Sequence, residues 1–98
     1  MSGAEAVIER AVCRYAEELN CLVLKFRAVG VRGVPDRLFL PVNRRPFFIE
    51  FKAPGGVVSS AQYRMHTKLR ARGHSVYIVS DALVGKGIIR ALTRDPAC

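Results

Sequence analysis

Residues 33–55 read GVPDRLFLPVNRRPFFIEFKAPG, and this stretch decides the fold. It contains two apolar runs, Asp36–Leu40 and Phe47–Lys52, which are separated by prolines, arginines and an asparagine. This pattern predicts two antiparallel strands that are joined by a hairpin. The glycines and prolines that flank the two runs predict that each strand ends sharply.

The N-terminal side of this stretch predicts a helix, a strand and a loop. Ser2 and Glu5 have the spacing of a capping box, which favours a helix start. Apolar residues then recur at helical spacing as far as Asn20, and this recurrence predicts one amphipathic helix. Residues 21–26 are mostly apolar and predict a strand. The segment 27–35 is rich in glycine and ends in a proline, so we expect a loop there.

The C-terminal side predicts a second helix and a fourth strand. We expect the helix to be capped by Ser59 or Ser60, to run over about 60–72 and to end at a glycine. The sequence SVYIVS over 75–80 predicts the strand. The last segment is expected to be only weakly helical, because its two glycines disfavour a helix interior.

The predicted order is therefore α-β-β-β-α-β, followed by a C-terminal helical piece. The crossover from the third strand through the second helix to the fourth strand predicts a parallel pair. The hairpin predicts antiparallel pairing for the strands before it. We expect an α/β fold with a mixed four-stranded sheet flanked by helices, formed by a single domain over residues 1–98.

The composition indicates a compact and strongly cationic chain. It has 98 residues, a formal net charge of +8 and 50% hydrophobic residues, so a disordered basic tail is excluded. No apolar run is long enough to predict a membrane span, and no secretory signal is visible at the N-terminus. The three cysteines form no CxxC pair, which favours a reducing cytoplasm and disfavours a zinc site. The charge favours phosphate polyanions as partners.

Two carboxylates and an ammonium group are expected to meet at one edge of the sheet. Glu50 and Lys52 project from the same face of their strand, because side chains alternate along a strand. The hairpin brings Asp36, at the start of the neighbouring strand, beside them. Such a cluster suits Mg²⁺-assisted phosphodiester hydrolysis, with the backbone carbonyl of Phe51 as a further ligand. Lys52 would orient the attacking water or stabilise the developing negative charge. Glu9 on the first helix could add a third carboxylate.

Each of these residues also has an ordinary structural interpretation. Asp36 could be a turn residue at a strand entry. Glu50 and Lys52 could form an ion pair on a solvated strand face. His66 has no metal-ligand spacing to another histidine, and we expect it to be a partly buried histidine on a helix face.

The wider pattern resembles a known nuclease family. Pro35-Asp36 followed by Glu50-x-Lys52 is similar to the PD-(D/E)xK nuclease signature. The extended pattern resembles the virus-type replication-repair nuclease (VRR-NUC) domain. The residues that carry this resemblance are Lys25-Phe26, Arg32-Gly33-Val34-Pro35-Asp36-Arg37, Phe48-Ile49-Glu50-Phe51-Lys52-Ala53-Pro54-Gly55 and Gln62.

The resemblance implies a restriction-endonuclease-like core and a nuclease that depends on Mg²⁺ or Mn²⁺. It implies metal binding by Asp36, Glu50 and a helix acid, which is Glu9 or, one turn away, Glu5. It implies a catalytic role for Lys52 and a supporting role for Gln62. Stand-alone members are similar to phage and archaeal Holliday-junction resolvases, so a homodimer in the cytoplasm of a bacterial or phage-infected cell is expected.

The basic residues predict a surface that binds branched or duplex DNA. We expect neither a membrane partner nor a small-molecule cofactor. The residues expected to contact phosphates are Lys25, Arg27, Arg32, Arg37, Arg44, Arg45, Arg64 and Lys68. Such contacts position DNA without reading its sequence. Two alternatives remain open. The same site could act as a flap, nicking or exonuclease, or the chain could be a non-catalytic nucleic-acid-binding module.

Overall fold

The computed structural model describes residues 3–93. Its elements follow the predicted order, and the predicted C-terminal helical piece is a third helix. They are α1 (Ala4–Glu18), β1 (Leu22–Lys25), β2 (Arg37–Leu40), β3 (Phe47–Phe51), α2 (Ser60–Ala71), β4 (Ser75–Val79) and α3 (Ala82–Thr93).

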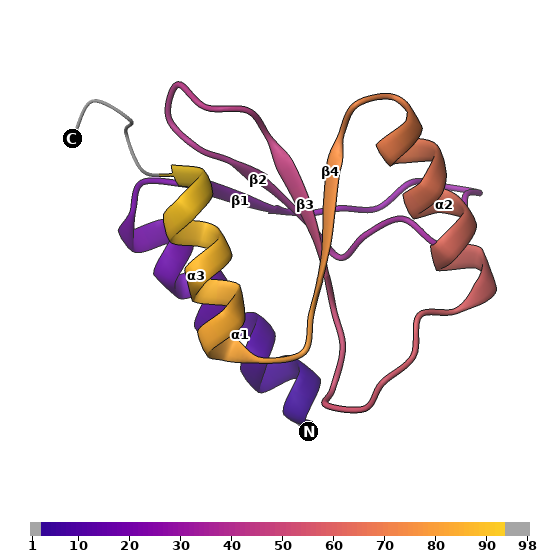
Figure 1. The fold of residues 1–98 in the computed structure, drawn as a ribbon, viewed down its shortest axis with the longest axis horizontal. Helices are drawn as coiled ribbons and strands as arrows, with labels where there is room; N and C mark the ends of the chain where they lie inside the picture. Colours follow the sequence, from indigo (N-terminus) through magenta and orange to yellow (C-terminus); the bar gives the residue numbers. More distant parts are fainter. Residues whose placement is uncertain (1–2, 94–98) are drawn as a thin grey trace.

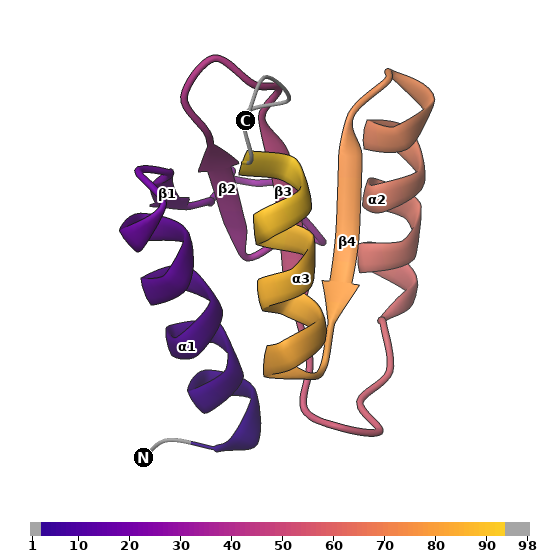
Figure 2. The same cartoon turned by 60° about the vertical axis from the view of Figure 1, so that its left-hand side comes forward.

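The strands form one mixed sheet in the order β1-β2-β3-β4. β2 pairs antiparallel with both β1 and β3, whereas β3 and β4 are parallel. Figure 1 shows α1 and α3 on one face of the sheet and α2 on the other, and Figure 2 shows the same three layers from a second direction. The predicted α/β fold, with its mixed four-stranded sheet flanked by helices, is therefore confirmed.

The hydrophobic core lies between the sheet and the α1–α3 pair. Phe47, Ile49 and Phe51 alternate along β3, so all three project to this face, and each is at most 2% exposed. Phe39 on β2 stacks on Phe47, with ring centroids 5.0 Å apart. Within residues 3–93, no helix is long and apolar enough to cross a membrane.

The first helix differs slightly from the prediction at both ends. The expected cap, Ser2, lies outside the described residues, and α1 begins after Gly3 without a side-chain cap. The helix ends at Glu18, before the predicted end at Asn20. Asn20 has a φ of 63°, and this left-handed conformation turns the chain out of the helix toward β1.

The second helix starts with a capping box, and Ser59 is the N-cap of the two candidates. The amide of Gln62 donates to Oγ of Ser59 at 3.1 Å, and the amide of Ser59 donates to Oε1 of Gln62 at 2.9 Å. Because these two bonds satisfy backbone donors at the helix start, they fix both the first turn of α2 and the side chain of Gln62.

The expectation of a weakly helical last segment is wrong, since α3 is a regular helix over Ala82–Thr93. Asp81 caps it by accepting a 3.0 Å hydrogen bond from the amide of Val84. Gly85 has a structural use here. A Cβ atom at this position would lie 2.6 Å from Val12 and 2.9 Å from Val79, so the glycine allows α3 to pack closely on α1 and β4. This packing outweighs the low helix propensity of glycine.

Candidate active site

Asp36 and Glu50 meet because of the register between β2 and β3. Arg37, the first residue of β2, pairs with Ile49. Continuing this register by one residue places Asp36 opposite Glu50. The backbone amide of Phe51 donates to Oδ2 of Asp36 at 2.7 Å, so the Asp36 side chain holds the two strands together where the regular ladder stops.

The alternation along β3 separates the charged residues from the core. Phe51 is fully buried toward α1 and α3. Glu50 projects to the other face, under α2, and is only 2% exposed. Lys52 lies on the same side, with Nζ 3.7 Å from Oε2 of Glu50. The predicted convergence of Asp36, Glu50 and Lys52 at one edge of the sheet is therefore present in the structure.

Gln62 connects the lysine to the buried carboxylate. Its Nε2 donates to Oε2 of Glu50 at 3.1 Å, and its Oε1 accepts from Nζ of Lys52 at 2.8 Å. The same Oε1 also accepts the amide of Ser59. The capping box at the start of α2 thus fixes the orientation of the glutamine, and the glutamine fixes the positions of Lys52 and Glu50.

The electrostatics of this cluster favour a cation. Burial raises the pKa of Glu50 to about 8, and the charge of Asp36 and a side-chain hydrogen bond with it act in the same direction. The ammonium group of Lys52 opposes this rise only partly. Oε1 of Glu50 is buried and has no hydrogen-bond partner. A positive ion beside the two carboxyl groups would relieve this unfavourable environment.

The donor set fits Mg²⁺ or Mn²⁺. Within residues 3–93, no group of three or more His, Cys, Asp or Glu side chains is arranged to hold a metal ion. Mg²⁺ does not need such a group, because it is commonly bound through one or two carboxylates and keeps several waters or substrate phosphates. Asp36 and Glu50 supply the two carboxylates. The backbone carbonyl of Phe51, which the sequence predicts as a further ligand, lies at the same end of β3 as Glu50.

Glu9 is not brought together with these residues. Its Oε2 accepts a 2.6 Å hydrogen bond from Nε of Arg37. Arg37 lies opposite the core residue Ile49 and faces α1, whereas Glu50 faces α2. Glu5, one turn earlier on α1, contributes to the raised pKa of Glu50. Of the two helix acids that the sequence leaves open, Glu5 is the one whose charge reaches Glu50.

The predicted phosphate-contacting residues lie at two ends of the sheet. Lys25, Arg27 and Arg32 lie at the end of β1 and in the loop before Asp36, and all three are exposed. Arg64 and Lys68 are exposed on α2. Arg44 and Arg45 lie on the β2–β3 hairpin at the opposite end, where Arg45 donates to the carbonyl of Gly73. Arg37 is half-buried and paired with Glu9.

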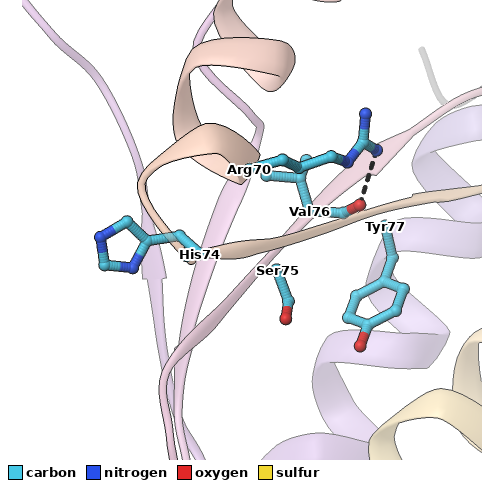
Figure 3. Close-up of a pocket in the computed structure, with 6 residues that line it drawn as sticks. Arg70, His74, Ser75, Val76 and Tyr77 are labelled. Carbon is cyan, nitrogen blue, oxygen red and sulfur yellow. Dashed lines mark hydrogen bonds between the residues drawn. The ribbon is translucent and has the colours of Figure 1, made fainter.

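A pocket of about 400 Å³ lies away from the carboxylates (Figure 3). It is formed where α2 ends and β4 begins, and two of its lining residues are joined by a hydrogen bond of 2.7 Å from Arg70 to the carbonyl of Val76. Its lining residues are Arg70, Gly73, His74, Ser75, Val76 and Tyr77. Because Glu50 lies near the other end of α2, this pocket is separate from the candidate site.

His66 is the residue at this site that the sequence interpretation missed. We expected a partly buried histidine, but it is only 1% exposed, and its Nε2 lies 3.6 Å from Oε1 of Glu50. A signal was available in the sequence. His66 follows Gln62 by one helical turn, so both side chains lie on the same face of α2.

Comparison with known proteins agrees with this geometry. No family model matches the chain. It is similar to "Putative nuclease p44" of Acyrthosiphon pisum secondary endosymbiont phage 1, with 37% identity over 77 residues, which cover 79% of this chain and 83% of the relative. A solved structure described as "VRR_NUC domain" matches with a TM-score of 0.81 and 27% identity, covering 91% of this chain and 97% of the other. The chain therefore belongs to the VRR-NUC family of nucleases.

Proposed function

We propose that this nuclease is a Mg²⁺-dependent endonuclease that hydrolyses phosphodiester bonds in branched DNA. The observation that carries the proposal is the hydrogen-bonded cluster of Asp36, Glu50, Lys52 and Gln62 at the edge of the sheet. The carboxyl groups of Asp36 and Glu50 favour a hard divalent cation, because Oε1 of Glu50 is buried and has no hydrogen-bond partner. A lysine held 3.7 Å from one of these carboxylates suits the negative charge that develops on a phosphate.

Each residue of the cluster has a distinct role in this proposal. Asp36, Glu50 and the carbonyl of Phe51 would hold Mg²⁺ or Mn²⁺, which when bound lowers the pKa of water and neutralises phosphate charge. Lys52 orients the attacking water or stabilises the charge on the phosphate. Gln62 keeps the lysine extended toward the site, because its amide oxygen accepts the Nζ hydrogen bond at 2.8 Å.

In this proposal Asp36 and Glu50 are the carboxylate ligands, and Glu5, in place of Glu9, is the helix acid whose negative charge adds to the attraction for the metal ion. Glu5 is exposed at the start of α1, and its charge acts on Glu50. Glu9 is instead bound to Arg37, which lies next to Asp36 in the chain. The alternative, in which Glu9 is a ligand, requires that its ion pair with Arg37 opens when DNA and metal bind.

The DNA contacts are assigned to the end of the sheet that carries the cluster. Lys25, Arg27 and Arg32 lead along the chain to Asp36, and Arg64 and Lys68 lie on the helix above Glu50. Arg44 and Arg45 would contact only DNA that extends to the far end of the sheet. If these cations bind phosphates, affinity for duplex DNA falls with salt, with a slope of about −0.9 per neutralised phosphate.

A homodimer completes the proposal. A four-way junction has two-fold symmetry and needs two symmetric cuts, whereas residues 3–93 of each chain carry one such cluster, so a symmetric dimer supplies the second. β4 is the edge strand beside β3 in the described sheet, and its residue Ile78 is 43% exposed, which leaves room for a second copy. The enzyme would meet such DNA in the cytoplasm of a bacterial or phage-infected cell.

The proposal is tested by cleavage of end-labelled four-way junctions, flaps, splayed duplexes and linear duplexes in Mg²⁺, Mn²⁺ or EDTA. We expect paired symmetric nicks in the four-way junction, with no cleavage in EDTA. Cleavage of flaps or free ends in its place would assign the alternative flap, nicking or exonuclease activity. Tight binding of every substrate without cleavage in either metal would identify a non-catalytic DNA-binding module and overturn the proposal.

A further inference from the structure

His66 occupies an unusual position for a titratable side chain. It lies in the middle of α2 and is the residue of Ser60–Ala71 that is buried, at 1% exposure. An amphipathic helix normally places an apolar side chain at its most buried position. A histidine there would ordinarily be retained because it forms hydrogen bonds with its neighbours.

The hydrogen bonds expected of a buried histidine are absent. Neither Nδ1 nor Nε2 of His66 has a hydrogen-bond partner, and the same is true of Oε1 of Glu50. Two of these unpartnered atoms face each other, since Nε2 of His66 lies 3.6 Å from Oε1 of Glu50. A small rotation of either side chain would bring them within the range of an N–H···O hydrogen bond, about 2.7–3.2 Å.

The two oxygens of Glu50 are approached by residues one helical turn apart. Gln62 donates to Oε2 at 3.1 Å, and His66 lies beside Oε1. In its neutral form, an imidazole ring carries one N–H donor and one acceptor nitrogen. A neutral donor can orient a carboxylate without competing with a cation for its charge.

We propose that His66 is a positioning residue for Glu50, with its Nε2–H donating to Oε1 of the carboxylate. Together with Gln62, it fixes both oxygens in the orientation that a divalent cation requires. The inference rests on the proposed function, because it assumes that Glu50 is a metal ligand. Partners of this kind typically contribute 10–100-fold to metal affinity or activity.

The test compares His66→Gln, His66→Asn and His66→Leu in the full chain. The amide nitrogen of glutamine can reach the position of Nε2, whereas that of asparagine corresponds to Nδ1, which faces no oxygen of Glu50. Mn²⁺ affinity without DNA is measured by calorimetry, and cleavage is measured under single-turnover conditions. We expect H66N and H66L to weaken Mn²⁺ binding by about 10–100-fold. We expect H66Q to retain binding and cleavage within about threefold of the wild type.

A structural control separates positioning from simple packing. Met65→Ala truncates a partly buried neighbour on α2, so it should lower the thermal unfolding temperature and leave Mn²⁺ affinity unchanged. Wild-type Mn²⁺ affinity in H66L, or equal losses in H66Q and H66L, would overturn the role of His66. Absence of Mn²⁺ binding and cleavage in the wild type would instead overturn the proposed function.

A second measurement does not depend on the folding of any variant. The ¹⁵N chemical shifts of the His66 ring in the Mg²⁺-loaded wild type report which nitrogen carries the hydrogen. We expect a neutral ring with hydrogen on Nε2 and a bare Nδ1. The opposite tautomer, with hydrogen on Nδ1, would contradict donation to Glu50.

Discussion

Oδ2 of Asp36 accepts a 2.7 Å hydrogen bond from the backbone amide of Phe51. This bond joins the loop before β2 to the last residue of β3. A shift of the Asp36 carboxylate is therefore transmitted to β3, the strand that carries Glu50. The assigned strand begins at Arg37, one residue later than the sequence predicts. Asp36 pairs with the end of β1 through its backbone, whose carbonyl accepts from the amide of Phe26 at 3.0 Å, and with β3 through its side chain.

The raised pKa of Glu50 predicts how the metal-free protein responds to pH. The pKa rises from 4.5 to about 8, so the unfolded chain releases this proton first and folding stability falls as pH increases through this interval. Below pH 6.5, His66 makes folding stability rise with pH, because burial lowers its pKa from 6.5. Between pH 6.5 and 8 in EDTA, we therefore expect the free energy of unfolding to fall by at most about 1.4 kcal/mol per pH unit.

The control for this pH dependence is Glu50→Gln, which removes the titrating proton and keeps the shape of the side chain. Urea unfolding of both proteins in EDTA gives the comparison. The variant should lose most of the decline between pH 6.5 and 8. An equal decline in both proteins would assign the pH dependence to other groups.

Lys52→Ala should lower the single-turnover cleavage rate by about 10²–10³-fold, because the ammonium group acts on charge that develops during the reaction. Calorimetric Mn²⁺ affinity should change much less. Lys86→Ala removes the same charge from α3 on the opposite face of the sheet and should cleave at the wild-type rate. Parallel losses of rate and affinity in Lys52→Ala would indicate that the lysine is structural.

Gly33 allows the loop before Asp36 to pack on the first turn of α2. Its φ is +85°, and a Cβ atom there would lie 2.2 Å from the carbonyl oxygen of Ala61 and 2.9 Å from the amide of Gln62. Gly33→Ala should therefore displace the turn that holds Gln62 and reduce both stability and cleavage. Gly30→Ala is the matched control, since its φ is +75° but no atom lies within 4 Å of the added Cβ.

Urea unfolding and single-turnover cleavage distinguish these two loop variants. Gly30→Ala should lose about 1–2 kcal/mol, the typical cost of a left-handed conformation in a residue other than glycine, and should cleave normally. Gly33→Ala should lose more stability and also cleave slowly. Equal effects would mean that the contact with α2 does not matter for the site.

The two glycines of α3 should respond to alanine in opposite directions. Gly85→Ala places a methyl group against Val12 and Val79, both fully buried, and should cost about 1–3 kcal/mol. Gly87 is exposed, with no atom within 4 Å of an added Cβ, so Gly87→Ala should stabilise the protein by about 0.5–1 kcal/mol. Thermal unfolding measures both changes, and stabilisation by Gly85→Ala would contradict the close packing of α3.

The sequence predicts the fold well because periodicity and turn residues agree along the chain. The hairpin over 41–46 and the alternation in β3 are local patterns, and together they predict the meeting of Asp36, Glu50 and Lys52. The third helix is not predicted well, since the benefit of Gly85 comes from tertiary contacts with Val79 on the preceding strand and with Val12, which is distant in sequence.

The remaining parts of the site depend on tertiary register. Glu5 and Glu9 share one face of α1, so helical spacing cannot tell their roles apart. The position of Arg37 on the sheet distinguishes them, because Arg37 binds Glu9. The burial of His66 depends on how α2 lies over Glu50, which helical spacing alone cannot give. The placement of Arg44 and Arg45 away from the site was already implicit in the hairpin topology.

The central claim, that Asp36 and Glu50 act in metal-dependent cleavage, is tested most directly with Asp36→Asn. Single-turnover cleavage of a labelled four-way junction in Mg²⁺ is measured beside junction binding. Asp81→Asn is the matched control, because asparagine can still cap α3. We predict that Asp36→Asn loses at least about 100-fold in rate while binding within about threefold of the wild type, and that Asp81→Asn cleaves normally. Undiminished cleavage by Asp36→Asn would contradict the account.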